Sequence, residues 1–305
     1  MKILITGATG FVGRRLCQVL SEGGHTLSAF SRDPWAAQRR VPALQQVFQW
    51  DSAVAPPPKE TFEEVDAVIN LAGATIAGRW TTAKKRAIRE SRVLGTRHLV
   101  AGIERCAKRP KVLISTSAVG YYGDQGEKLV TEESPPGSDF LAQICREWEV
   151  EAARAEELGL RVVRLRISTV LGPKGGALQA LLPLFKWGLG GPLGSGRQWW
   201  PWIHRDDLVG LILYTLQNDL SGPINAAAPQ PVRQKEFAQT LGRILRRPTV
   251  FPAPSLGLRV VLGKFASTLL ASTRAVPKRA QEAGYQFRFP ELEAALRDAL
   301  GIKKL

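Results

Sequence analysis

Hydroxyl and phenol side chains gather in one short stretch of the sequence, STSAVGYYGD, at residues 115–124. Three consecutive hydroxyl residues, 115–117, are followed by Tyr121 and Tyr122. Such groups can hydrogen-bond a substrate oxygen or supply the proton that a developing alkoxide needs. The apolar residues before them, KVLI, are typical of a buried strand. We therefore expect these side chains at the end of a strand, where ligands bind in α/β proteins.

A glycine-rich motif, GATGFVG, follows another apolar run at residues 2–6. Gly7 permits a tight strand-to-helix turn, Gly10 lets the backbone approach a pyrophosphate, and Gly13 lets the next helix pack closely on the strand. Thr9 adds a hydroxyl at the start of that helix, where free N–H groups favour phosphate. The motif predicts a dinucleotide site in a βαβ unit.

The end of the second predicted strand, residues 25–33, bears on which dinucleotide fits. An NAD enzyme usually places Asp or Glu there to accept the ribose 2′-hydroxyl. This chain has Ser31 and Arg32, and a guanidinium beside a hydroxyl suits a 2′-phosphate. The next residue, Asp33, is the acidic alternative that would favour NAD. We predict NADP(H) as the cofactor.

The other apolar runs predict an α/β fold, a doubly wound parallel Rossmann sheet with a smaller C-terminal α/β region on the substrate side. Leu71, Ala72 and Gly73 end one of its strands, and their small size leaves room for a ligand at the sheet edge. Asp51 ends an earlier strand, where it either meets the adenine amino group or belongs to a plain loop. Further strands are expected at 111–124 and 161–173, and long helices at 81–107 and 139–158.

The predicted domains are interleaved along the chain. The cofactor domain covers residues 1–171 and is rejoined by 206–229, and 172–305 supply the substrate side and the C-terminal region. Within that region PTVFPAP (248–254) resembles a strand. Residues 255–273 are apolar but interrupted by basic residues and glycines, so we expect a helix packed on the body of the protein and no membrane partner.

The composition narrows the classes of partner. The net charge of +15 is high for 305 residues, but the basic residues are dispersed and no nucleic-acid-binding signature accompanies them. A basic surface can instead attract a polyanionic cofactor. The cysteines, Cys17, Cys106 and Cys145, match no metal or redox spacing, and no export signal precedes the first strand. We expect reduced thiols, no metal site, no nucleic acid partner and a cytoplasmic location.

A series of motifs resembles that of an extended short-chain dehydrogenase/reductase of the nucleotide-sugar epimerase kind: GATGFVG, NLAG, STSAVGYYGD, RISTVLGP and PWIHRDDLVG, in this order. Residues 188–207 and 274–300 resemble an atypical branch, the epimerase-like NADP-binding family with a small C-terminal domain of unknown function. The resemblance covers nearly the whole chain. It implies NADP binding and a small-molecule substrate without naming one. It also allows a homodimer through the helices at 81–107 and 139–158.

Motif and resemblance together define the predicted site. Ser117 best matches the superfamily's serine, and Tyr122 matches its structural tyrosine, which leaves Tyr121 as the better proton donor. His204 matches a substrate-side histidine of epimerase-like members. The predicted catalytic residues are therefore Ser117, Tyr121 and His204. The predicted cofactor-binding residues are Gly7, Thr9, Gly10, Phe11, Val12, Gly13, Ser31, Arg32, Asp51, Leu71, Ala72, Gly73, Arg92, Ser115 and Val170.

The superfamily's central pair of catalytic residues is missing. In typical members a tyrosine protonates the alkoxide and a lysine one turn later lowers its pKa. Aligned on Glu147, those two positions hold Asp139 and Gln143. A neutral amide cannot depress the pKa of a phenol, and an aspartate ionised at neutral pH is a base rather than an acid.

Two features around the PWIHRDD motif suggest local roles. Asp206 and Asp207 are expected to cap the helix at 206–218. The tryptophans of WWPW, residues 199–202, follow the glycine-rich loop 188–196. They form either a mobile lid with aromatic contacts for a sugar-like ligand, or a buried cluster.

Three functions stay open from the sequence. The first is an NADP-dependent oxidoreductase or epimerase-like enzyme acting on an unidentified small polar substrate. The second is a non-catalytic NADP(H)-binding regulator or scaffold, which the missing Tyr-Lys pair favours. The third, nucleic-acid binding, would require an affinity that depends on salt and ranks last.

Overall fold

The apolar runs form one parallel sheet in the computed structural model, which describes residues 1–302. The sheet has seven strands in the order β11-β7-β5-β4-β1-β2-β3, and every neighbouring pair is parallel. The predicted doubly wound Rossmann sheet is confirmed. Its strands are β1 (Lys2–Thr6), β2 (Thr26–Ser31), β3 (Gln46–Gln49), β4 (Ala67–Asn70), β5 (Val112–Ala118), β7 (Arg161–Ile167) and β11 (Gly222–Ala226).

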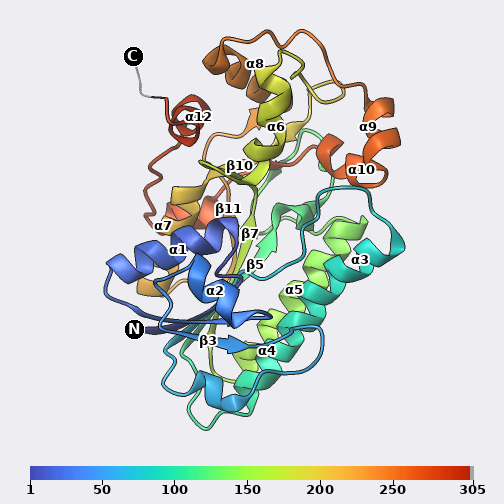
Figure 1. Cartoon of the computed structure of the whole chain (residues 1–305). Helices are drawn as coiled ribbons and strands as arrows, with labels where there is room; N and C mark the ends of the chain where they lie inside the picture. Colours follow the sequence, from blue (N-terminus) through green and yellow to red (C-terminus); the bar gives the residue numbers. More distant parts are fainter. Residues whose placement is uncertain (303–305) are drawn as a thin grey trace.

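Helices cover both faces of this sheet (Figure 1). Successive residues of β1 point to opposite faces, so Ile3 and Ile5 join one hydrophobic cluster and Leu4 another. The first cluster packs α1 (Phe11–Glu22) and α7 (Arg205–Gln217), and the second packs α4 (Gly95–Glu104) and α5 (Phe140–Glu157).

The long helix predicted at 81–107 is one run with an irregular centre. It begins as α3 (Thr82–Arg89), passes through a π-helical turn at Glu90–Leu94, and continues as α4. A π-turn inserts an extra residue into the helix and occurs frequently at functional sites. This one lies against the loop that follows β4, because Ser91 and Arg92 hydrogen-bond the backbone of Ala74.

A smaller lobe stands on the carboxyl edge of the sheet. Its core joins α6 (Gly176–Lys186), α8 (Gln234–Leu245) and α12 (Leu292–Leu300) around the buried Trp200 and Trp202. Two short strand pairs tie it to the sheet domain: β8 (Thr169–Leu171) with β10 (Trp202–His204), and β6 (Leu129–Val130) with β13 (Arg274–Ala275). A third pair, β9 (Trp199–Trp200) with β12 (Val232–Arg233), lies within the lobe. Trp200 and Trp202 are therefore core residues rather than lid residues.

Two predictions for this lobe are wrong. Residues 248–254 form no strand, only an isolated bridge between Ala253 and Leu193. The helix expected at 255–273 is two short helices, α9 (Ser255–Leu262) and α10 (Phe265–Leu270), because Gly263 between them adopts a φ of 59° that ends α9. Contrary to expectation, α9 buries none of its residues. A further short helix, α11 (Lys278–Glu282), follows β13.

Candidate cofactor and substrate site

A cavity of about 930 Å³ opens at the carboxyl ends of β1, β2 and β4. This is where ligands bind in open α/β sheets, next to the point at which the strand order reverses. The residues of the prediction that line it are Gly7, Thr9, Gly10, Ser31, Arg32, Asp51, Leu71, Ala72 and Gly73. Its volume suits an extended dinucleotide.

The glycine motif leaves no room for side chains. A Cβ on Gly7, whose φ is 71°, would lie 2.8 Å from the Leu71 carbonyl carbon, and one on Gly13 would lie 2.3 Å from the Gly7 carbonyl oxygen. Helix α1 begins after Gly10, with no side chain capping its first N–H groups. Those N–H groups are thus available to a phosphate, and the residues present fit a dinucleotide.

The corner of the cavity after β2 is basic. The carboxylate of Asp33 is occupied as the N-cap of α2 (Pro34–Arg40), where its Oδ1 accepts from the Ala36 N–H at 2.9 Å. The Ser31 hydroxyl donates to the Asp33 carbonyl at 2.9 Å and closes this turn. Arg32 and Arg40 both line the cavity. Arg40 was missed from the sequence, because its place depends on where α2 ends.

Asp51 and Trp50 form the next part of the wall. The Asp51 Oδ1 accepts from the Ala53 N–H at 2.9 Å and so holds the loop after β3. Trp50, not predicted, lines the cavity and packs on Phe30 with ring centroids 4.8 Å apart. The pair supplies an apolar surface beside the polar Asp51, which is the kind of wall that an adenine ring needs.

The loop after β4 is held by side chains from both sides. The Thr6 hydroxyl accepts from the Ala72 N–H at 3.1 Å, and the Ser91 hydroxyl accepts from the Ala74 N–H at 3.0 Å. Arg92 donates to the Ala74 carbonyl at 3.0 Å and lies over the Trp148 ring. The π-turn thus directs Ser91 and Arg92 onto one loop. Arg92 supports the cavity wall and is not among the residues that line it.

Other predicted cofactor residues also lie outside this cavity. Phe11 sits against the loop after β8, where a Cβ on Gly175 would come within 2.3 Å of its ring. The guanidinium carbon of Arg205 lies 5.4 Å from the centroid of the Phe11 ring. Ser115 is buried and its hydroxyl accepts from Asn70 Nδ2 at 3.2 Å. The predicted cofactor-binding residues that do not line this cavity are Phe11, Val12, Gly13, Arg92, Ser115 and Val170.

Ser117 belongs to a buried ionic network. Its hydroxyl donates to Glu149 Oε1 at 2.7 Å, and Glu149 receives two hydrogen bonds of 2.8 Å from the Arg166 guanidinium. All three side chains are buried. With its proton committed to a carboxylate, Ser117 is not poised to donate to a substrate oxygen.

The two tyrosines differ in their surroundings. Tyr122 is fully buried and donates to Asn225 Oδ1 at 2.6 Å, and burial raises the pKa of its phenol to about 12. Tyr121 is half-buried, and the Arg166 guanidinium carbon lies 3.6 Å from the centroid of its ring. Tyr122 thus has the structural role expected of it, and Tyr121 is the more accessible phenol.

Asp139 and Gln143, which stand at the positions of the Tyr-Lys pair, lie at the start of α5. Asp139 is the N-cap of this helix, and its Oδ1 accepts from the N–H groups of Leu141 and Ala142 at 2.8 and 3.0 Å. Gln143, one turn later, is exposed. Asp139 therefore serves the start of the helix, and neither residue type can replace a tyrosine or a lysine in proton transfer.

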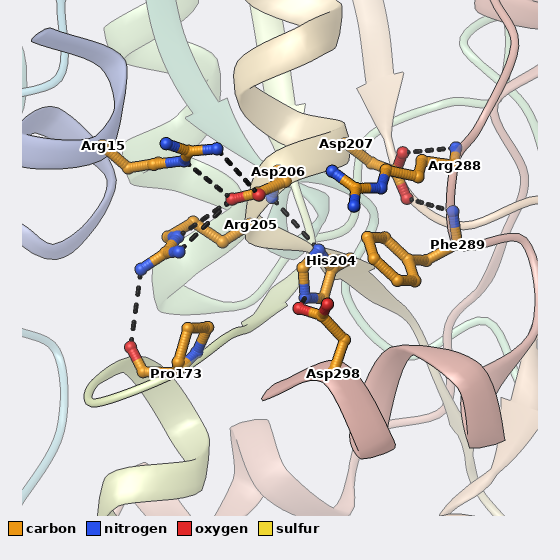
Figure 2. Close-up of polar contacts among 9 residues, drawn as sticks. All are labelled: Arg15, Pro173, His204, Arg205, Asp206, Asp207, Arg288, Phe289 and Asp298. Carbon is orange, nitrogen blue, oxygen red and sulfur yellow. Dashed lines mark hydrogen bonds and ion pairs between the residues drawn. The ribbon is translucent and has the colours of Figure 1, made fainter. Parts of the chain in front are cut away.

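His204 is fully buried at the start of α7 (Figure 2). Its Nδ1 accepts from the Asp206 N–H at 3.2 Å as the N-cap, and its Nε2 lies 3.2 Å from Asp298 Oδ2 on α12. Burial lowers the pKa of its imidazole to about 4, an effect that outweighs the nearby Asp298. The position fits a neutral residue that joins elements, and it gives no support to substrate contact.

The two aspartates after His204 do not cap α7, so that prediction is wrong (Figure 2). Asp206 accepts two hydrogen bonds from Arg15 on α1, at 3.1 and 3.2 Å. Asp207 accepts from the backbone N–H groups of Arg288 and Phe289, at 2.7 and 3.0 Å. The imidazole of His204 already occupies the cap position, which leaves both carboxylates free to hold other segments.

The chain resembles known proteins over its whole length. Residues 3–227 match the NAD dependent epimerase/dehydratase family, and residues 253–299 match a domain of unknown function, DUF1731. The epimerase family protein SDR39U1 homolog, chloroplastic, of Arabidopsis thaliana is 41% identical over 97% of this chain and 86% of its own.

Other relatives agree with this assignment. The Bacillus subtilis epimerase family protein YfhF is 38% identical over 100% of this chain and 99% of its own. The crystal structure of human epimerase family protein SDR39U1 (isoform2) with NADPH superposes with a TM-score of 0.89, at 35% identity and 99% coverage of both chains.

Proposed function

We propose that this chain, which belongs to the NAD dependent epimerase/dehydratase family, is an NADP(H)-dependent oxidoreductase or epimerase-like enzyme for a small polar substrate. The observation that carries the proposal is the basic corner of the cavity, where Ser31, Arg32 and Arg40 face the space after β2 while Asp33 is engaged as a helix cap. That chemistry suits a 2′-phosphate. The NADPH in the human relative supports the same cofactor.

The cofactor would be held by three parts of the chain. The free N–H groups at the start of α1 would bind the pyrophosphate. Ser31, Arg32 and Arg40 would bind the 2′-phosphate, and Trp50 with Asp51 would contact the adenine. When bound, the nicotinamide supplies or accepts a hydride.

We further propose Tyr121 as the proton donor. Typical members use a tyrosine that lies beside a lysine, and here Arg166 is the cation that lies against a tyrosine ring. Ser117 is less suited to this role, because its hydroxyl is bound to the Glu149 carboxylate. His204 is less suited because its side chain is fully buried. The substrate would be a small polar molecule, with sugar-like compounds as the first candidates.

Mass spectrometry and absorbance of the cofactor that co-purifies with the protein provide the first test. Pools of carbonyl compounds, including sugars, are then added to the NADPH-bound protein while the reduced nicotinamide signal is followed. We expect one pool to oxidise NADPH, and Tyr121→Phe to abolish that oxidation without changing NADPH affinity. Oxidation that survives Tyr121→Phe would remove this residue from the mechanism.

A second function is supported by a different observation. Asp139 caps α5 and Ser117 is bound to Glu149, so the usual catalytic positions serve the fold. A non-catalytic NADP(H)-binding regulator or scaffold would look the same. Tight NADP(H) binding with no change of redox state in any pool would favour it. We retain, as part of the proposal, a cofactor domain of residues 1–171 rejoined by 206–229 and a substrate side from 172–305.

A further inference from the structure

Helix α9 is an apolar helix without an interior partner. Its sequence SLGLRVVL contains five aliphatic side chains, yet none of its residues is buried. Leu256, Val260 and Val261 are 73%, 67% and 70% exposed. Figure 1 shows α9 at the outer edge of the smaller lobe. Leaving this much aliphatic surface in water is unfavourable, so a contact outside the chain is expected.

The exposed apolar surface extends beyond α9. The segment 188–194 lies alongside the residues before α9, because Gly194 N–H donates to the Ala253 carbonyl at 2.9 Å and Ala253 N–H donates to the Pro192 carbonyl at 2.8 Å. Both segments carry exposed large side chains. We define the α6–α9 surface by its exposed residues Leu184, Trp187, Leu189, Val250, Phe251, Leu256, Val260 and Val261.

The chain segments that carry this surface are basic. Residues 174–205 and 237–281 contain neither aspartate nor glutamate. The exposed cations of these segments include Arg246, Arg259 and Lys264, each within four positions along the chain of an exposed apolar residue of this surface. Apolar side chains combined with lysine and arginine favour the headgroup region of a bilayer with anionic lipids, each cation near the surface adding to the attraction.

We propose that the α6–α9 surface binds the face of a membrane that contains anionic phospholipids. A second copy of the chain fits less well, because pairing this surface with itself would bring arginines and lysines together. A nucleic acid would match the charge but not the exposed leucines and valines. Within residues 1–302 no helix is long and apolar enough to cross a bilayer, so the contact would lie on the membrane surface.

Flotation of the full chain with vesicles tests this proposal. We use phosphatidylcholine vesicles with about one-third phosphatidylglycerol, and pure phosphatidylcholine vesicles as the neutral comparison. The chain should float with the anionic vesicles at low salt and largely detach at about 0.5 M salt. Val260→Asp should lower the partition coefficient by about tenfold or more, because it places a like charge against the lipid headgroups.

Val150→Asp is the matched control, since Val150 is an exposed valine on α5, outside the α6–α9 surface. It should float like the original chain, and circular dichroism should show both variants folded. Absence of flotation with anionic vesicles, or equal losses in both variants, would overturn the proposal. So would a dimer seen by light scattering that Val260→Asp dissociates while vesicles bind neither form.

Discussion

At the scale of single residues, the choice between NADP and NAD depends on which way one carboxylate points. The sequence places Arg32 and Asp33 side by side, which leaves both cofactors open. The fold assigns Asp33 to the N-cap of α2, where its Oδ1 is bound by a backbone N–H. Asp33 still lines the cavity, but Ser31, Arg32 and Arg40 line the same corner, and the two arginines favour a phosphate over a hydroxyl.

Removing either cavity arginine should therefore weaken NADPH and spare NADH. We expect Arg32→Ala and Arg40→Ala each to reduce NADPH affinity by about 10- to 100-fold, the loss of one charge-assisted contact. Arg39→Ala is the control, because Arg39 lies over Trp35 and does not line the cavity. Titration of nicotinamide fluorescence measures all three. Equal losses for NADPH and NADH would contradict the 2′-phosphate assignment.

Burial of His204 should make the stability of the fold depend on pH. Its pKa is about 4 in the folded chain against an ordinary 6.5, so the unfolded chain takes up a proton first as the pH falls. The contribution of the neutral imidazole to the free energy of unfolding is fully present above pH 6.5 and is lost as the pH falls from 6.5 toward 4. The decline from this group is about 1.4 kcal/mol per pH unit.

His204→Asn keeps an N-cap acceptor and removes the titration. Urea unfolding of both proteins should show their stability difference shrinking by about 2 kcal/mol between pH 6.5 and about 5. The carboxylates that face the imidazole, Asp206 and Asp298, are present in both proteins and so cancel to first order. Parallel pH profiles for the two proteins would show that His204 is not neutral in the folded chain.

At the scale of elements, a buried ion pair joins α5 to the sheet. Glu149 on α5 and Arg166 on β7 are both nearly inaccessible and share two hydrogen bonds. Such a pair adds little by itself, but breaking it leaves a charge buried without a partner. Arg166 also donates to the Tyr122 hydroxyl and packs on Tyr121, so the pair orders the phenols as well.

Glu149→Leu should cost about 3–5 kcal/mol in the free energy of unfolding, because Arg166 loses its counter-charge. The double variant Glu149→Leu with Arg166→Met should recover part of that loss by removing the orphan charge. Chemical denaturation of the single and double variants gives both values. A double variant that is less stable than the single one would mean that Arg166 has other essential partners.

The sheet elements were predictable because each buried strand is a short apolar run next to glycine or a hydroxyl cluster, as in KILIT before Gly7. The lobe was harder to predict. Residues 255–273 have the composition of one packed helix, and only the φ of Gly263 and the absence of an inner partner make them two. Hydrophobicity predicts burial only where some other element covers the surface.

The cavity was predicted where backbone geometry demands a residue type, as at Gly7, and where small residues end a strand. Arg40 and Trp50 were missed because they come to the site through the length of α2 and the packing on Phe30. Glu149 was missed for a similar reason: its contact with Ser117 spans 32 positions. Contacts across elements leave no local pattern in a sequence.

At the scale of the whole molecule, the C-terminal segment is attached to the sheet domain through α7 (Figure 2). The buried carboxylate of Asp207 binds two consecutive backbone N–H groups of that segment, and the Tyr285 hydroxyl donates to the Asp207 carbonyl at 2.8 Å. Asp206, one residue earlier, binds Arg15 on α1. One turn of α7 thus links α1 to the C-terminal segment that contains Arg288 and Phe289.

Asp207→Ala should destabilise the C-terminal segment, residues 285–302, more than it destabilises the central strands of the sheet. It leaves two N–H groups without acceptors, and we expect faster amide exchange in residues 285–302 than in the central strands. Hydrogen–deuterium exchange with mass spectrometry measures this. Asp219→Ala, at an exposed position beyond the end of α7, should change little. Uniformly faster exchange throughout the chain would mean that tail and sheet open together.

The place of β11 at the edge of the sheet has a consequence for how the protein is made. Its partner β7 ends at Ile167, but β11 begins only at Gly222. During synthesis at about 5–20 residues per second, the edge of β7 stays unpaired for several seconds while the intervening segment is translated. An exposed strand edge is a site for misassociation. The seven-stranded sheet is therefore completed only by residues translated well after the glycine motif, and a nascent chain that stops in between would expose the unpaired edge of β7.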